Sequence, residues 1–464
     1  MEVYGSIEDL REDLGPAAAL GAGLDFHDLS LFRRQHLDRL VYSAVFAPQE
    51  SVRQASRWVI RKGAGAAGIC SASIHDLYTA RGRGEWSGFT VPAINIRGLT
   101  YDTARAVFRA AIQRDVGAVI LEIARSEIGY TEQRPAEYTA VVTAAALREG
   151  WCGPLFLQGD HFQFNAARHA VDPEAETQAV LDLTQEAIEA GFLNIDIDSS
   201  TLVDLSRATV EEQQRTNFQR AAQCLRAIRT WQPDGVTISV GAEIGEVGKK
   251  NSTRGELIAF MEGLSREMER AEAAQPGPSK ISVQTGSSHG GIPLPDGRVA
   301  EVSIDFETLR ELSQLSRQRF QMAGAVQHGA STLPRELFHR FPQVETAEIH
   351  LATGFQNIIY EHASFPAALI QEIEDHLKTA HADERRPGQS EAQFLYKTRK
   401  KAFGPFKRRM WDLGMEIRGP IGESLERQFG FLFEQLGVAG SRALVEKWTP
   451  LVERPLPPPD GLNP

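Results

Sequence analysis

Three histidines each follow a short apolar run of the kind that forms a buried strand. Asp160 and His161 come after the run 155–157, and His289 and His328 come after two later runs, each followed by glycine. Three neutral imidazoles with one open position are typical of a catalytic zinc site, and an adjacent carboxylate can carry a proton. A lone histidine at such a place is more often a packing or hydrogen-bonding residue. Three of them at strand ends instead favour a metal centre.

The elements that must bring these residues together form a regular series. From residue 89 onward, short apolar runs alternate with longer segments of helical periodicity, giving eight expected strand–helix units up to residue 365. The expected strands cover 91–96, 117–123, 155–157, 193–198, 236–243, 280–284, a run ending at 327, and 347–352. Such alternation is typical of a parallel sheet, and eight units of this length indicate the α/β class and a closed (β/α)8 TIM barrel.

The carboxyl ends of the strands meet at one mouth of such a barrel, where active sites lie. Asp198 ends the fourth expected strand, and Glu243 ends the fifth. Thr353 follows the eighth. We therefore expect these polar side chains to converge with the histidines on one small volume.

The remaining residues are expected to extend the barrel at both ends. Residues 1–88 show helical periodicity and are predicted to form a helical N-terminal extension. Residues 366–464 are predicted to form a helical C-terminal extension that ends in a disordered, proline-rich tail. The glycine- and alanine-rich segment 63–68 has neither the lysine of a phosphate loop nor the context of a dinucleotide fingerprint. It is predicted to be a loop or a packing contact.

The composition narrows the class of ligand. The chain has 464 residues and a net charge of -11, which argues against nucleic-acid binding. No apolar run approaches about 18 residues, so no membrane span is expected, and the N-terminus lacks the pattern of a signal peptide. The three cysteines have no metal or redox spacing and fit reduced thiols. We expect a cytoplasmic protein that binds small molecules.

The ordered set of motifs resembles a known family. Segments 160–161, 286–290 and 328–331 resemble the metal-site motifs of the class II, zinc-dependent fructose-bisphosphate and tagatose-bisphosphate aldolases. Further matches follow in the same order, at 91–95, 197–200, 241–245, 304–306 and 349–353. The resemblance covers roughly residues 73–365. It implies a lyase of carbohydrate metabolism, such as glycolysis, that acts on a phosphorylated ketose.

The resemblance also implies a role for each site residue. Zinc would be held by His161, His289 and His328 and would stabilise the enediolate left after carbon–carbon cleavage. Asp160 would exchange a proton with the hydroxyl on the carbon being cleaved. The phosphate would be held by Gly290, Gly329, Ser331 and Thr353. Asp198 and Glu243 are weaker candidates, with Glu243 either an alternate ligand or a structural ion-pair partner.

A basic segment, 397–411, is similar to the C-terminal arm of longer family members. Such an arm reaches a phosphate in the neighbouring subunit, which makes Arg408 or Arg409 a candidate anion contact. A homodimer is the corresponding family expectation. A solvated, basic start of a helix explains the same charges equally well.

Three positions depart from the family pattern. The loop 248–253 has no carboxylate where the family has a proton-carrying glutamate, and it contains Lys249 and Lys250. His350 takes the place of the asparagine that helps to hold the enediolate and is our candidate for that contact. The lysine expected in 291–295 is missing.

These departures leave three interpretations. Glu246 could supply the missing base. The substrate could differ from that of a standard aldolase, with an added anionic group that contacts Lys249 and Lys250. The chain could also be a non-catalytic barrel subunit that stabilises a true aldolase, although three converging histidines argue against a purely structural role.

Overall fold

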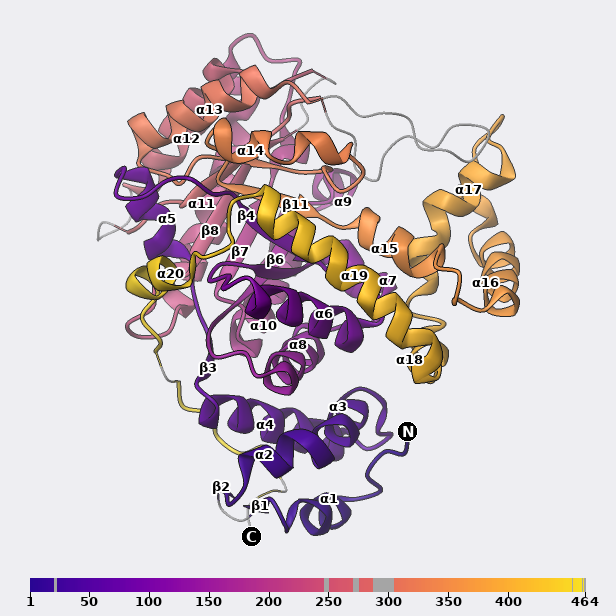
Figure 1. Cartoon of the computed structure of the whole chain (residues 1–464). Helices are drawn as coiled ribbons and strands as arrows, with labels where there is room; N and C mark the ends of the chain where they lie inside the picture. The colour runs from indigo at the N-terminus through magenta and orange to yellow at the C-terminus, as the bar shows by residue number, and fades with distance from the viewer. Residues whose placement is uncertain are drawn as a thin grey trace.

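The computed structural model describes residues 1–20, 23–245, 250–269, 275–286, 304–452, 454–460 and 462. Among these residues, eight parallel strands close into a barrel, because β6 pairs with β5 on one side and with β7 on the other. The barrel strands are β4 (Val91–Asn95), β5 (Ile120–Ala124), β6 (Gly153–Gln163), β7 (Asn194–Asp198), β8 (Ser239–Gly245), β9 (Lys280–Val283), β10 (Ala325–Gln327) and β11 (Glu348–Leu351). The predicted (β/α)8 TIM barrel is confirmed (Figure 1).

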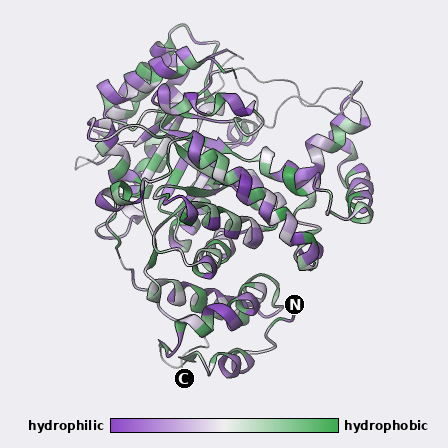
Figure 2. Ribbon diagram, viewed as in Figure 1, coloured by the Kyte–Doolittle hydropathy of each residue, from purple (hydrophilic) through white to green (hydrophobic). Residues whose placement is uncertain are grey.

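Helices surround the barrel and follow its strands in order. They are α6 (Thr100–Gln113), α8 (Pro135–Glu149), α10 (Pro173–Ala190), α11 (Val210–Trp231), α12 (Arg254–Met268), α13 (Phe306–Phe320), α14 (Arg340–Gln343) and α15 (Thr353–Tyr360). Their ends follow local chemistry, since Thr209 and Thr253 each form a capping box that starts α11 and α12. Gly150 and Gly191 end α8 and α10 with a positive φ. Figure 2 shows hydrophobic and hydrophilic residues alternating around these helices, as expected for helices packed on a sheet.

Two short helices stand at the carboxyl ends of neighbouring strands. α7 (Arg125–Tyr130) follows β5, and α9 (Ala166–Val171) follows β6. Both therefore lie at the mouth of the barrel, where their side chains can reach a bound molecule.

The N-terminal extension is helical with one added hairpin. It contains α1 (Ile7–Leu14), β1 (Ala18–Leu20), β2 (Leu24–Phe26), α2 (Leu29–Leu31), η1 (Phe32–His36), α3 (Leu37–Phe46), α4 (Glu50–Ala66) and α5 (His75–Gly82). A further strand, β3 (Ile69–Ser71), pairs with the start of β6 outside the barrel. The sequence did not predict β3, because three residues are too short for a periodic signal.

Of the two alternatives predicted for the glycine- and alanine-rich segment at 63–68, the structure shows a packing contact and not a loop up to Ala66. α4 continues through it, and a Cβ added at Gly63 would lie 2.7 Å from Cε1 of Phe32. The small residue therefore allows close packing of α4 against Phe32, which was the alternative reading of this segment.

The C-terminal extension packs back on the barrel. It contains α16 (Ala367–Ala380), η4 (Ala382–Glu384), α17 (Glu391–Thr398), η5 (Arg399–Ala402), α18 (Lys407–Trp411), α19 (Met415–Gln435) and α20 (Arg442–Trp448). α19 lies along α6 on the outside of the barrel (Figure 1). No described helix is long and apolar enough to cross a membrane.

The described part of the proline-rich tail is packed, so the prediction of a disordered tail is wrong for these residues. The indole N–H of Trp58 donates a hydrogen bond to the carbonyl oxygen of Leu456 over 3.0 Å. Leu462 is fully buried. The two leucines give the tail an apolar anchor, and prolines reduce the conformational entropy that such a segment loses on packing.

Candidate metal centre and active site

An irregularity in β6 turns His161 away from the regular strand pattern. The register between β6 and β7 shifts between Gly159 and Phe162, and His161 has a φ of 40° in the left-handed region. A Cβ on Gly159 would lie 2.5 Å from Cζ of Phe162, so only glycine leaves room for that ring. A bulge of this kind redirects a side chain, and it is commonly found next to active sites.

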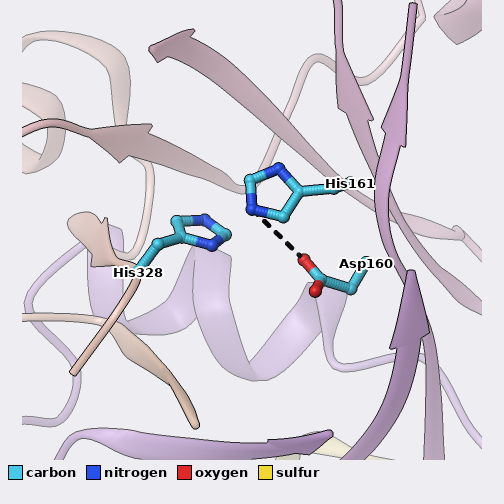
Figure 3. Close-up of side chains that lie close together, drawn as sticks. All are labelled: Asp160, His161 and His328. Carbon is cyan, nitrogen blue, oxygen red and sulfur yellow. Dashed lines mark ion pairs between the residues drawn. The ribbon is translucent and has the colours of Figure 1, made fainter. Parts of the chain in front are cut away.

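His161, His328 and Asp160 converge at the carboxyl ends of β6 and β10 (Figure 3). The two imidazole rings have centroids 4.1 Å apart, and Nε2 of His161 lies 3.8 Å from Oδ1 of Asp160. One potential ligand atom from each of the three residues lies within 4.8 Å of the others. Imidazole nitrogen and carboxylate oxygen are donors that suit zinc or a similar divalent ion, so the residues fit a metal. The third predicted ligand, His289, and the neighbouring Gly290 lie outside the described residues.

Two further carboxylates hold His161 from the other side. Oδ2 of Asp198 lies 3.2 Å from Nδ1 of His161, and Oε2 of Glu243 lies 3.1 Å from the same atom. Burial disfavours the charged imidazole, but Asp160 and Glu243 outweigh it and hold the pKa of His161 well above its usual value. Both carboxylates predicted as weaker candidates therefore contact a central site residue, where they can fix its tautomer or offer oxygen ligands.

His350 lies beneath Asp160 at the bottom of the site. Its Nδ1 is 3.1 Å from Oδ1 of Asp160 and 3.2 Å from Oε2 of Glu122, while its Nε2 is 2.6 Å from Oε1 of Glu348. The centre of its ring lies 4.1 Å from that of the His328 ring, and the two ring planes are tilted by 40°. His350 lines the cavity as predicted, but carboxylates engage both of its ring nitrogens, so it orients Asp160 as well as facing the ligand.

Charged residues fill the barrel interior below His350. Lys280 is fully buried, with Nζ 3.0 Å from Oδ2 of Asp196, and it also forms an ion pair with Glu348. The hydroxyl of Tyr78 donates to Oε2 of Glu348 over 2.5 Å. Burial raises the pKa of Asp196 to about 6. The interior of a TIM barrel is usually filled by branched apolar side chains, so this network is a departure from the common pattern.

The network holds more acid than base. Four buried carboxylates surround two cationic side chains, namely Glu122, Asp160, Asp196 and Glu348 around Lys280 and His350. Burial and the charge of Asp160 raise the pKa of Glu122 to about 7. The excess of negative charge favours a bound cation directly above it. The sequence did not predict this network, although its members are visible as charged residues within the strands.

Above the metal centre lies a cavity of about 720 Å³. Its walls include three of the four predicted phosphate contacts, Gly329, Ser331 and Thr353. Nη1 of Arg97 donates to Oγ1 of Thr353 over 3.4 Å, and the Arg97 guanidinium forms an ion pair with Glu127 over 2.7 Å. The predicted phosphate residues therefore share one wall with a cation that the sequence did not reveal.

Lys400 is a second cation on the wall of this cavity. It is half-buried, and its Nζ lies 5.6 Å from the ring centre of Tyr130. Burial and the charge of Arg97 lower the pKa of Lys400. Lys400 has no ion pair with any described residue, so its charge is available to an anion. The sequence signal was the basic segment 397–411, which we expected to reach a neighbouring subunit.

Two predicted anion contacts lie away from the cavity of their own chain. Lys250 is exposed and does not line it. Arg408 lies on α18, with its guanidinium over the rings of Tyr42 and Phe46 at 5.9 and 5.6 Å from their centres. Its reach into a second subunit stays a prediction.

Fold and site together define a (β/α)8 barrel with a histidine–carboxylate centre at its mouth. The chain belongs to the class II fructose-bisphosphate aldolase family, whose model matches residues 83–410. A search of curated protein sequences found no match.

Several solved structures are similar to this chain at low identity. The fructuronate-tagaturonate epimerase UxaE from Cohnella laeviribosi is 13% identical with a TM-score of 0.54, over 92% of this chain and 90% of that chain. A probable tagatose 6 phosphate kinase from Sinorhizobium meliloti 1021 is 16% identical with a TM-score of 0.53, over 77% and 93%. The fructose-bisphosphate aldolase from Campylobacter jejuni is 16% identical with a TM-score of 0.47, over 80% and 96%.

Removing His328 should remove the bound metal. We expect the His328→Ala variant to retain less than about a tenth of the zinc or other divalent ion that the wild-type chain binds, because one of few nitrogen donors is lost. Metal content is measured by mass spectrometry after desalting. His362→Ala is the matched control, because His362 hydrogen-bonds Ser424 far from the site. Equal metal content in both variants would show that His328 is not a ligand.

Metal binding should release protons near neutral pH. Burial and the charge of Asp198 raise the pKa of Glu243 to about 7, so much of this carboxyl is protonated at pH 6 in the metal-free chain. A cation displaces such protons, so affinity should rise and proton release should fall between pH 6 and pH 8. Calorimetry in buffers of different ionisation enthalpy measures both quantities. An affinity independent of pH over this range would contradict the expectation.

Removing Lys280 should destabilise the fold. The Lys280→Met variant leaves the surrounding carboxylates without their buried partner, and we expect a loss of about 3–5 kcal/mol in the free energy of unfolding. Urea denaturation with the metal removed measures this loss. Adding Glu348→Gln to the variant should recover part of it, whereas the surface variant Lys401→Met should change stability by less than about 0.5 kcal/mol. If the double variant has a lower free energy of unfolding than Lys280→Met alone, the charge argument is wrong.

Proposed function

We propose that this protein is a zinc-dependent aldolase that cleaves and forms a carbon–carbon bond in a phosphorylated ketose, such as a fructose- or tagatose-bisphosphate. One observation carries the proposal. This chain belongs to the class II aldolase family, and its Asp160 lies beside His161 and His328 at the mouth of the barrel. The cavity above them is large enough for a sugar phosphate.

The chain's own residues can divide the reaction between them. His161 and His328 would hold a divalent ion, with His289 as the predicted third ligand, and that ion would supply a Lewis acid at the ketose carbonyl. Asp160 accepts the proton of the hydroxyl on the carbon that is cleaved, and returns it when the bond forms. His350 holds Asp160 in place through its 3.1 Å contact and balances its charge. Asp198 and Glu243 hold His161 in one orientation.

The cations of the cavity fit an anionic substrate. Gly329, Ser331 and Thr353 lie on the wall that Arg97 reaches, which suits one phosphate. Lys400 lies on the wall of the same cavity without an ionic partner among the described residues. It suits a second anionic group, so a bisphosphate or a phosphorylated sugar acid fits better than a monophosphate.

A second candidate function uses the same bond-breaking step without release of the fragments. If the aldehyde rotates so that its other face is attacked when the bond re-forms, the product is an epimer of the substrate. UxaE is named a fructuronate-tagaturonate epimerase, and its fold covers 92% of this chain, including regions outside the part that the aldolase family model matches. The carboxylate of a hexuronate suits Lys400 as well as a phosphate does. This coverage is the observation that favours the second candidate.

One experiment separates the candidates. The purified protein, with its metal content measured, is incubated with ketose monophosphates, ketose bisphosphates and ketohexuronates, with and without a chelator. Chelator-sensitive release of an aldehyde supports the aldolase, and an epimer without released aldehyde supports the second candidate. Metal-loaded protein that turns over none of these compounds would instead support a non-catalytic subunit.

The Asp160→Asn variant should retain metal and lose turnover. Loss of the proton carrier is expected to lower kcat by a factor of about 10²–10⁴. Metal content and kcat are measured on the same preparation. Loss of metal together with turnover would show that Asp160 acts mainly as a ligand.

Lys400→Met should weaken binding of the anionic substrate. Losing a charge-assisted contact of about 1.5–3 kcal/mol corresponds to a fall of about 10–100-fold in kcat/KM, mostly through KM. Lys401→Met is the matched control, because Lys401 pairs with Glu384 outside the cavity. Equal kinetics in the two variants would exclude Lys400 from substrate binding.

A further inference from the structure

A second cavity of about 770 Å³ lies at the opposite end of the barrel. It is enclosed by α4, β3, the first residues of β6 and the C-terminal tail. β6 runs from this cavity, where Leu155 lies, to the metal centre at His161. The two cavities are therefore separated by the length of a strand. Figure 1 shows the tail passing alongside α4 toward the hairpin of β1 and β2.

Two arginines face this cavity. Arg61 from α4 and Arg454 from the tail have no hydrogen bond or ion pair with any residue that the structure describes. The Nη2 atoms of both lie 3.4 Å from the point that a Cβ at Gly191 would occupy, so they are at most about 6.8 Å apart. The hydroxyl of Ser71 lies 3.1 Å from the same point. Two guanidinium groups and one hydroxyl thus meet at one place.

Such an arrangement is unfavourable unless an anion joins it. Burial and the charge of Arg454 lower the pKa of Arg61 to about 10. Other buried arginines of the chain have acceptors, since Arg81 donates to the carbonyl oxygen of Phe89 over 2.9 Å and Arg229 to that of Ile238 over 2.7 Å. An unpaired, partly desolvated guanidinium costs free energy, and two close together repel each other.

The acidic residues nearby do not remove this cost. Glu189 and Asp234 line the cavity but are exposed at its rim. Within the described part of the chain, neither forms an ion pair with Arg61 or Arg454. The rest of the lining combines apolar side chains, among them Phe26, Leu155 and Leu456, with Lys62, Cys70 and Thr143.

We propose that this cavity is a binding site for the phosphate group of a small metabolite, held by Arg61, Arg454 and Ser71. Guanidinium groups bind phosphate oxygens through paired hydrogen bonds, and two of them match the two charges of a phosphate monoester. The apolar walls contact the carbon body of the ligand. Because Arg454 belongs to the tail and Arg61 to α4, the ligand fastens the tail to the N-terminal extension, far from the reacting atoms.

The test uses the full-length protein and thermal unfolding. Inorganic phosphate and glycerol 1-phosphate are titrated at constant ionic strength, with chloride as the reference anion. We expect a saturable rise of about 2 °C or more in Tm with either phosphate compound, because a ligand that binds only the folded state stabilises it. A larger rise with glycerol 1-phosphate identifies a monoester as the preferred form. No rise with either compound would overturn the proposal.

Variants assign the effect to this cavity. Arg61→Met removes an unpaired charge, so this variant should unfold at the wild-type temperature or higher without ligand, and its phosphate affinity should fall at least about tenfold. Arg454→Met should behave in the same way, while Arg215→Met, at an exposed position, should keep wild-type affinity. If Arg61→Met unfolds at a lower temperature without ligand, the guanidinium is structural and the proposal fails.

A final arm separates this site from the mouth of the barrel. In the Lys400→Met variant the phosphate-dependent rise in Tm should persist, because Lys400 lies in the other cavity. A rise that is lost in Lys400→Met and kept in Arg61→Met would place the phosphate at the mouth and overturn the proposal. Neither outcome depends on aldolase turnover, so the result stands apart from the proposed function.

Discussion

The excess of negative charge inside the barrel is the constraint on which the rest of the site depends. Lys280 has no solvent exposure and holds Asp196 and Glu348, while His350 joins Glu348 to Asp160. Two buried cations do not neutralise four carboxylates, so protons or a bound cation must supply the difference. The imidazoles of His161 and His328 stand at the upper end of this network. A metal held there would add the positive charge that the network below it lacks.

The same network favours a histidine at position 350, where the family resemblance led us to expect an asparagine. An amide at this position would contact Asp160 without adding charge, and it would leave Glu122, Glu348 and Asp196 with Lys280 alone. The imidazole contributes a positive charge, and burial is outweighed by Glu122 and Asp160, so its pKa lies well above the usual value. The positive charge of His350 therefore depends on the acidic strand residues of this chain.

The sequence predicted the barrel because most of its strands are short apolar runs separated by long helical segments, as at β4 and β5. It predicted the meeting of His161 and His328 because parallel strands bring their carboxyl ends to one mouth. It did not predict β3, the packing of the tail or the interior charges. A single Glu122 or Lys280 within an apolar strand does not alter the strand pattern, and its partners lie on other strands. Only the closed barrel shows that these charges meet.

The C-terminal arm shows that a composition signal leaves the position of each cation open. The basic segment is similar to an arm that reaches a neighbouring subunit, and this similarity made Arg408 a candidate anion contact. In this chain the segment lies against its own barrel, since the amide of Gly404 donates to the carbonyl oxygen of Tyr130 over 3.2 Å. Lys407 forms an ion pair with Glu137 in α8. These contacts place Lys400 on the wall of the mouth cavity of the same chain. A cation of this segment thus reaches the cavity from the same chain, while a contact of Arg408 with a second subunit stays a prediction.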